Sequence, residues 1–375
     1  MNFKEYLIGS ERRRALSYIE GFVVEAFGLG ARITPISSED LTSHLNKVMS
    51  GEQSKADRFK MPYIHKGNIV ITDEQGKKYD LEALKKLITQ RPDDLLQKNE
   101  KIVHSGGGST QYFNIGLPAL KGLAVNESTG EFVIVDTCPG AGACKVVCYA
   151  RKGGYVQWKD SSLSQTKKLN FLLNDPEGFK NALIKQIRNK VKYYSRPKQG
   201  GTKVVVRWHD AGDFFSDEYM NLAFDVAKAI PEAEFYAYTK MASVAGADKP
   251  KNFIINFSSG ATPEQESQVD LKKRKHSVIV PKALFQDMLY RDGDGKLQYE
   301  PSKLNDLKQR IAQKYNVDLK TVITYDEMKA KPYKVPLAMA GATEEFGPWN
   351  VIVKPGDGDE SANRKDVLGT YLLEH

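Results

Sequence analysis

The chain has 375 residues, of which 41% are hydrophobic and 27% charged, and it carries a formal net charge of +8. This length and composition allow a sizeable buried core, so they exclude a small disulfide-stabilised domain and a disordered, highly charged chain. The sequence has no run of about 18 apolar residues, and residues 1–14 lack the apolar core of a secretory signal. We therefore expect a cytoplasmic protein that does not bind a membrane.

Residues 1–100 are predicted to form a small N-terminal α+β accessory module. The apolar spacing predicts a helix over residues 12–28, a strand over 67–72 and a helix over 80–90. This module contains no catalytic motif. The polar residues 91–110 are predicted to link it to the rest of the chain.

Residues 101–375 are predicted to form a second domain of the α/β class. A strand over residues 202–209, a helix over 216–230 and a strand over 233–240 make one βαβ unit, with Ser216 as the helix N-cap. Further apolar runs predict strands at residues 131–136, 252–258, 276–281 and 321–325, and helices at 161–175 and 176–194. This alternation predicts a mostly parallel sheet, or a partial (β/α) barrel, with helices packed on it.

Side chains that can carry chemistry directly follow several of the predicted strands. In parallel sheets and (β/α) barrels, ligands bind at the carboxyl ends of the strands. We therefore expect these residues to converge on one site at the carboxyl ends of the strands: Cys138, His209, Asp210, Thr239, Lys240, Ser258 and Ser259.

All three cysteines of the chain, Cys138, Cys144 and Cys148, lie within eleven residues with the spacing C-x5-C-x3-C. Clustered thiols in a reducing compartment indicate a metal or redox site rather than a disulfide framework. A structural zinc would need a fourth ligand from a distant residue such as His104 or His209. A [4Fe–4S] cluster accepts cysteines from one irregular loop, and three of them leave one iron open to substrate. The spacing favours the cluster, with zinc and unliganded thiols as alternatives.

Four segments, in this order, resemble the bacteriophage protein family known as "gene product 88". The resemblance covers about residues 104–260 and is carried by FNIGLPA (113–119), TCPGAGACKVVCYARKG (137–153), RWHDAGDFFSDEYM (207–220) and FYAYTK (235–240). It implies a phage-encoded iron–sulfur protein of the host cytoplasm, with a cysteine loop distantly similar to those of radical-SAM-type proteins. Family members often carry further cysteines near the carboxyl end, whereas residues 355–375 have none. We therefore expect a single cluster.

The segment RWHDAGDFFS, residues 207–216, is the second candidate site. His209, Asp210 and Asp213 are predicted to serve as catalytic acid, base or supporting groups beside the open iron. Gly212 allows the turn that brings Asp213 back towards His209. In the alternative interpretation, Asp210 caps the turn, Asp213 pairs with Arg207 and His209 is a satisfied core histidine.

Three further residues are predicted to bind a small-molecule substrate. Arg207 and His209 point to the same face of the predicted strand. Tyr238 and Lys240, on the neighbouring strand, can donate hydrogen bonds to the same substrate. The predicted substrate-binding set is therefore Arg207, Tyr238 and Lys240.

Three functions follow from these sites. The first is a metal-assisted hydrolase, such as an esterase, in which the open iron acts as a Lewis acid. The second is a radical enzyme that binds S-adenosylmethionine at that iron, but both gaps are longer than in the usual C-x3-C-x2-C loop. The third is a non-enzymatic protein that binds nucleic acid or modulates the host. Its support is the basic stretches at residues 180–198 and 271–275, which predict weak, non-specific binding at most.

Overall fold

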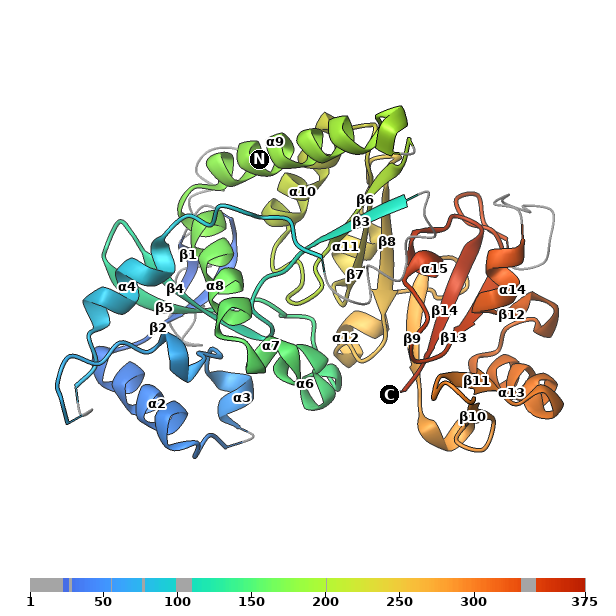
Figure 1. Ribbon diagram of the computed structural model, residues 1–375, viewed down its shortest axis with the longest axis horizontal. Coiled ribbons are helices and arrows are strands. Elements are labelled where there is room, and N and C mark those ends of the chain that lie inside the picture. The colour runs from blue at the N-terminus through green and yellow to red at the C-terminus, as the bar shows by residue number, and fades with distance from the viewer. Residues whose placement is uncertain are drawn as a thin grey trace, which may run out of the picture. The chain divides into compact units, whose positions relative to one another are not determined.

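The computed structural model describes residues 23–26, 29–54, 56–75, 78–98, 110–199, 201–331 and 342–374. None of the helices in these ranges is both long and apolar enough to span a membrane. The chain divides into two compact units (Figure 1). Unit 1 comprises Met1–Leu96, Ile115–Arg188 and His209–Ile230, and unit 2 comprises Gln97–Asn114, Asn189–Trp208 and Pro231–His375. Both units take segments from either side of residue 100, and a domain boundary there stays a prediction.

Unit 1 contains a four-stranded antiparallel sheet in the order β1-β2-β5-β4 (Figure 1). Its strands are β1 (Val23–Ala26), β2 (Ala31–Pro35), β4 (Lys121–Asn126) and β5 (Glu131–Asp136). Strand β1 shows that the helix predicted over residues 12–28 is wrong at residues 23–26, where pairing with β2 overrides the helical spacing. The rest of that predicted helix lies outside the described residues.

The long helices α4 and α8 pack against β4 of this sheet and against each other. Helix α4 (Leu81–Thr89) begins at the N-cap Asp80, whose side chain accepts the Ala83 N–H, and confirms the helix predicted over residues 80–90. The apolar core of this part of unit 1 also takes residues from α2 (Ser38–Ser50) and includes Leu41, Leu45, Leu84, Ile88, Leu123 and Phe132. Helix α8 spans Lys159–Asn174, and the other helices with residues in unit 1 are α3 (Asp57–Lys60), η1 (Lys66–Asn68), α6 (Cys144–Val147), η2 (Tyr149–Arg151), α7 (Gly154–Gln157), α9 (Pro176–Tyr194) and α10 (Asp217–Ala229).

Residues 67–72 do not form the predicted strand. Their first two residues belong to η1, and Ile71 makes only an isolated antiparallel bridge to Tyr79. Because residues 67 and 68 are part of η1, only residues 69–72 remain for strand pairing.

Unit 2 is built on an eight-stranded sheet in the order β12-β13-β14-β9-β8-β7-β6-β3 (Figure 1). The neighbouring strands from β12 to β6 pair in parallel, which confirms the predicted α/β fold with a mostly parallel sheet. The strands are β3 (Thr110–Ile115), β6 (Lys203–Trp208), β7 (Glu234–Thr239), β8 (Phe253–Ser258), β9 (His276–Val280), β12 (Val322–Thr324), β13 (Trp349–Val353) and β14 (Val367–Leu373), with a separate hairpin of β10 (Leu289–Arg291) and β11 (Leu297–Tyr299). The short helices are η3 (Pro197–Gln199), α11 (Ala242–Gly246), α12 (Pro263–Glu266), η4 (Lys282–Leu284), η5 (Pro301–Lys303), α13 (Leu304–Tyr315), η6 (Leu319–Thr321), α14 (Tyr325–Ala330) and α15 (Glu360–Asn363).

Strand β6 determines where the predicted site residues lie. Its side chains alternate between the two faces of the sheet, so Val205 and Arg207 share one face while Trp208 points to the other. Val205 packs in a buried cluster with Tyr236 of β7 and Leu368 of β14. Arg207 therefore enters a mostly apolar layer, where a charge requires a partner.

Candidate functional site

The three cysteines lie on the segment of unit 1 that follows β5. Cys144 begins α6, and Cys148 lies between α6 and η2. All three thiols are free and half-buried. The Cys138 Sγ accepts the Leu120 N–H at 3.3 Å, so a backbone donor already faces this sulfur.

The thiols of this loop influence one another's ionisation. Burial raises the pKa of Cys138, and the charges of Asp213 and Cys148 raise it further. Burial also raises the pKa of Cys148, with a second contribution from Cys144, while Arg151 and the backbone N–H groups of residues 150 and 151 favour its thiolate. Three interacting thiols in a partly buried loop are costly to ionise together, unless a cationic centre accompanies them.

Among the described residues, no group of three or more His, Cys, Asp or Glu side chains could hold one metal ion. Predicted zinc ligand His104 lies outside those residues. In a [4Fe–4S] cluster each thiolate binds a different iron, so the sulfurs need not converge on one point, and backbone N–H donors to the sulfurs are typical. Cys138, Cys144 and Cys148 are the thiols that would hold such a cluster.

The turn after β6 is tied to the start of the cysteine loop by a backbone hydrogen bond. His209 has φ of 69°, in the left-handed region, and Gly212 has φ of 82°. The Asp213 N–H then donates to the Thr137 carbonyl at 2.9 Å. Because Thr137 immediately precedes Cys138, this bond fixes Asp213 beside the first cysteine. The turn predicted at Gly212 is confirmed.

His209 lies in an aromatic environment. Its side chain is buried, its Nε2 lies 2.9 Å from the Tyr219 hydroxyl, and its ring packs edge-on against Phe214 with centroids 4.7 Å apart. This is the arrangement expected of a core histidine that orders its surroundings. The charge of Asp213 raises the pKa of Cys138, which links this aspartate to the first cysteine.

Asp210 is buried and held by two tyrosines of the cysteine segment. The Tyr155 hydroxyl donates to its Oδ2 at 3.0 Å, and the Tyr149 hydroxyl donates to its backbone carbonyl. Gly116 is required here, because a Cβ at that position would lie 2.2 Å from the Asp210 Oδ1. These contacts place the backbone of the second motif directly against the first.

Lys168, on α8, is a charged residue in unit 1 that the sequence pattern does not single out. It is fully buried, and its Nζ has no hydrogen-bond partner among the described residues. Burial lowers the pKa of Lys168 to about 8, and the charges of Asp210 and Asp94 oppose this shift. In the sequence Lys168 follows Lys167 directly, and a pair of lysines ordinarily indicates the solvated side of a helix.

The three predicted substrate-binding residues belong to unit 2. Arg207 Nη1 donates to Asp359 Oδ2 at 2.8 Å, and the hydroxyls of Tyr236 and Tyr238 donate to the same carboxylate at 2.9 and 3.1 Å. Lys240 Nζ donates to Ser258 Oγ at 2.9 Å. Arg207 thus has a buried partner, Asp359, that the sequence analysis did not identify, because it lies in a polar stretch that resembles an ordinary turn.

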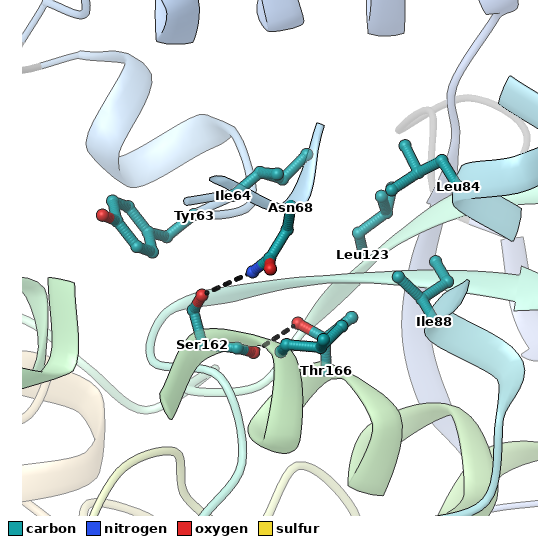
Figure 2. A pocket seen from close by; sticks show the side chains of 9 residues that line it. Tyr63, Ile64, Asn68, Leu84, Ile88, Leu123, Ser162 and Thr166 are labelled. Atoms are coloured by element: carbon teal, nitrogen blue, oxygen red, sulfur yellow. Dashed lines mark hydrogen bonds between the residues drawn. The ribbon is translucent and has the colours of Figure 1, made fainter. Parts of the chain in front are cut away.

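A small hollow lies between α4, α8 and the segment before η1 (Figure 2). It is lined by Tyr63, Ile64, Asn68, Leu84, Ile88, Leu123, Ser162, Leu163 and Thr166. Figure 2 shows Asn68 pointing to Ser162, whose Oγ accepts the Asn68 Nδ2 at 3.2 Å. The hollow has room for about one water molecule, so it is a packing defect rather than a substrate site.

Comparison with known proteins adds one match. The family model described as "Gene product 88" matches residues 87–321, a range that includes the cysteine loop and the turn after β6. No curated protein and no solved structure matches the chain.

Proposed function

The chain belongs to the Gene product 88 family, the bacteriophage family that its four motifs resemble, and we propose that it binds one [4Fe–4S] cluster. In this proposal Cys138, Cys144 and Cys148 are the ligands and one iron remains open to a small molecule. The observation that carries it is the interaction of three free thiols on one loop, with backbone donors to Cys138 and Cys148. In the host cytoplasm, which is a reducing compartment, the three thiols of a phage protein would stay reduced.

We further propose that the protein is a metal-assisted hydrolase, such as an esterase. When bound, the open iron supplies a Lewis acid. Asp213 is fixed beside Cys138 by its bond to Thr137, so its carboxylate can hold a proton next to the cysteine loop. The hydrogen bonds of Tyr149 and Tyr155 hold Asp210 in place, and they thereby keep the turn that carries Asp213 rigid.

The cluster is tested by anaerobic purification with iron and sulfide analysis. We expect a brown protein with a broad absorbance shoulder near roughly 400 nm and about four irons per chain. Cys138→Ser, Cys144→Ser and Cys148→Ser should each lose the colour, whereas Ala143→Ser, a similar change in the same loop, should keep it. A colourless protein with one zinc per chain would overturn the cluster.

The hydrolase is tested separately on the loaded protein. A panel of activated esters should be hydrolysed, and reduction in the presence of S-adenosylmethionine should give no 5′-deoxyadenosine. Formation of 5′-deoxyadenosine without ester hydrolysis would replace the hydrolase with the radical enzyme. Neither activity in a protein that holds its cluster would leave the cluster with a structural role.

A further inference from the structure

Large apolar side chains are exposed to solvent around the cysteine loop. Val146 is 74% exposed, Trp158 67%, Tyr149 57% and Val147 51%. Four of the ten exposed large hydrophobic residues in the described part of the chain therefore lie within thirteen consecutive positions. Apolar groups gathered in this way on a protein surface indicate a binding site.

Two aromatic rings of this segment are in contact. The rings of Tyr149 and Tyr155 meet edge-on, with centroids 5.8 Å apart. Trp158 lies against Gly154, where a Cβ would be 3.5 Å from the indole Cδ1. Tyr155 belongs to the same short helix as Gly154, α7, and Trp158 directly follows that helix. The bond from the Tyr149 hydroxyl to the Asp210 carbonyl fixes the first ring.

The charged side chains within this segment are all basic. Residues 137–159 contain no Asp or Glu, and Lys145, Lys152 and Lys159 are all exposed. The acid that precedes the segment, Asp136, is paired with Lys121 at 2.9 Å. We call the rings of Tyr149, Tyr155 and Trp158, together with Lys145, Lys152 and Lys159, the aromatic–basic surface.

We propose that the aromatic–basic surface binds single-stranded nucleic acid. Exposed rings and exposed ammonium groups on one segment suit a single strand, whose unpaired bases can stack on the rings while its phosphates attract the lysines, whatever the base sequence. The centre of a protein–protein interface is instead depleted in lysine, so the interleaved lysines favour a polyanion over a protein partner. This inference goes beyond the proposed function and does not depend on the cluster.

The other basic stretches are less suited to this role. Helix α9 buries Phe179, Leu183 and Ile187, so its basic residues form the solvated side of an amphipathic helix. Within residues 271–275, Lys275 is buried and donates to the carbonyls of Ser361, Arg364 and Val367. Its charge is not available at the surface.

The test measures binding of the full chain to a fluorescent oligothymidine of about 20 nucleotides, through the fluorescence anisotropy of the oligonucleotide at about 0.05 M salt. We expect binding that quenches the fluorescence of Trp158, the exposed tryptophan. Trp158→Ala should weaken affinity by about tenfold or more, because base stacking is lost, whereas Trp158→Phe should retain most of it. Lys152→Gln should weaken binding and reduce the salt slope by about 0.7. The matched control on α9, Lys192→Gln, should bind as the wild type does.

Three results would overturn the proposal. The first is the absence of binding at low salt. The second is an affinity that Trp158→Ala leaves unchanged, which would place the nucleic acid elsewhere on the chain. The third is equal competition by polyglutamate, which would indicate an acidic protein as partner. Duplex DNA of the same length should bind more weakly than the single strand, because its bases cannot stack on the rings.

Discussion

Arg207 and Asp359 form a buried ion pair in unit 2, with 2.8 Å between Nη1 and Oδ2, although 152 positions separate them in the chain. Asp359 also accepts the hydroxyls of Tyr236 and Tyr238, and the Arg207 guanidinium lies over the Tyr238 ring at 4.9 Å. The three hydrogen-bond donors offset the desolvation cost of burying the Asp359 carboxylate. The ion pair is therefore stable only while all of its partners are present.

Removing the acid should therefore destabilise unit 2 strongly. Asp359→Ala leaves the Arg207 charge buried without its counter-ion, and we expect a loss of about 3–5 kcal/mol in unfolding free energy. Urea denaturation measures this loss. The exposed pair Lys228–Asp225 provides the control, since Asp225→Ala should cost about 1 kcal/mol or less. Equal losses in the two variants would show that Asp359 does not compensate Arg207.

Gly212 should be essential to the turn that positions Asp213. Its φ is +82°, and an added Cβ would lie 2.9 Å from the Leu117 Cβ. Gly212→Ala therefore adds a clash to the backbone strain, and we expect a destabilisation of about 1–3 kcal/mol together with lower hydrolysis. Gly201→Ala isolates the strain alone, because Gly201 has φ of +62° with nothing within 4 Å of its Cβ position. If the two variants unfold at the same urea concentration, the close approach of Leu117 does not constrain the turn.

Much of the fold was predictable because the strands of the parallel sheet are continuous apolar runs. Strands β6, β7, β8, β9 and β12 coincide with such runs, and Ser216 caps α10 as predicted. The order of the strands was not predictable, since β14 inserts between β13 and β9 from the end of the chain. Pairing between distant segments depends on tertiary packing, which no local pattern encodes.

Some residues of the candidate site were likewise predictable from the sequence, and others were not. Spacing alone indicated the cysteines, and the Gly212 turn followed from the residue type. Asp359 and Lys168 were missed because a polar turn and a lysine pair normally face solvent. Their burial depends on which elements cover them, and that is a property of the assembled unit.

Lys168 should make stability depend on pH in the alkaline range. Its pKa is about 8 in the folded protein and 10.5 in the unfolded chain, so between these values the unfolded state binds more protons. The unfolding free energy should therefore rise with pH from about 8 to 10.5, by about 3 kcal/mol relative to a variant without the amine. The groups whose charges oppose the shift are Asp210 and Asp94.

The comparison of wild type with Lys168→Met tests this linkage. Urea unfolding at several values between pH 7 and pH 10 should show the wild type gaining stability over the variant as pH rises. Lys167→Met is the matched control, because the adjacent Lys167 bonds to Gln90 at an exposed site. A difference between wild type and Lys168→Met that stays constant across this range would show that Lys168 keeps its proton in the fold.

The last prediction separates the two candidate proton carriers. Asp213 is tied to Thr137 and raises the pKa of Cys138, whereas His209 packs between Phe214 and Tyr219. Asp213→Asn preserves the size of the side chain but removes the carboxylate, so ester hydrolysis should fall by roughly 10²-fold while the cluster absorbance is unchanged.

His209→Asn should instead lower stability, because it removes the ring that packs on Phe214, and should leave the hydrolysis rate of the folded protein within a few-fold of wild type. Both variants are assayed at the temperature where each is fully folded by circular dichroism. A large rate loss in His209→Asn with normal hydrolysis in Asp213→Asn would identify His209 as the proton carrier, despite its aromatic surroundings. Normal rates in both variants would remove the turn after β6 from the chemistry and leave the cysteine loop as the sole reactive element.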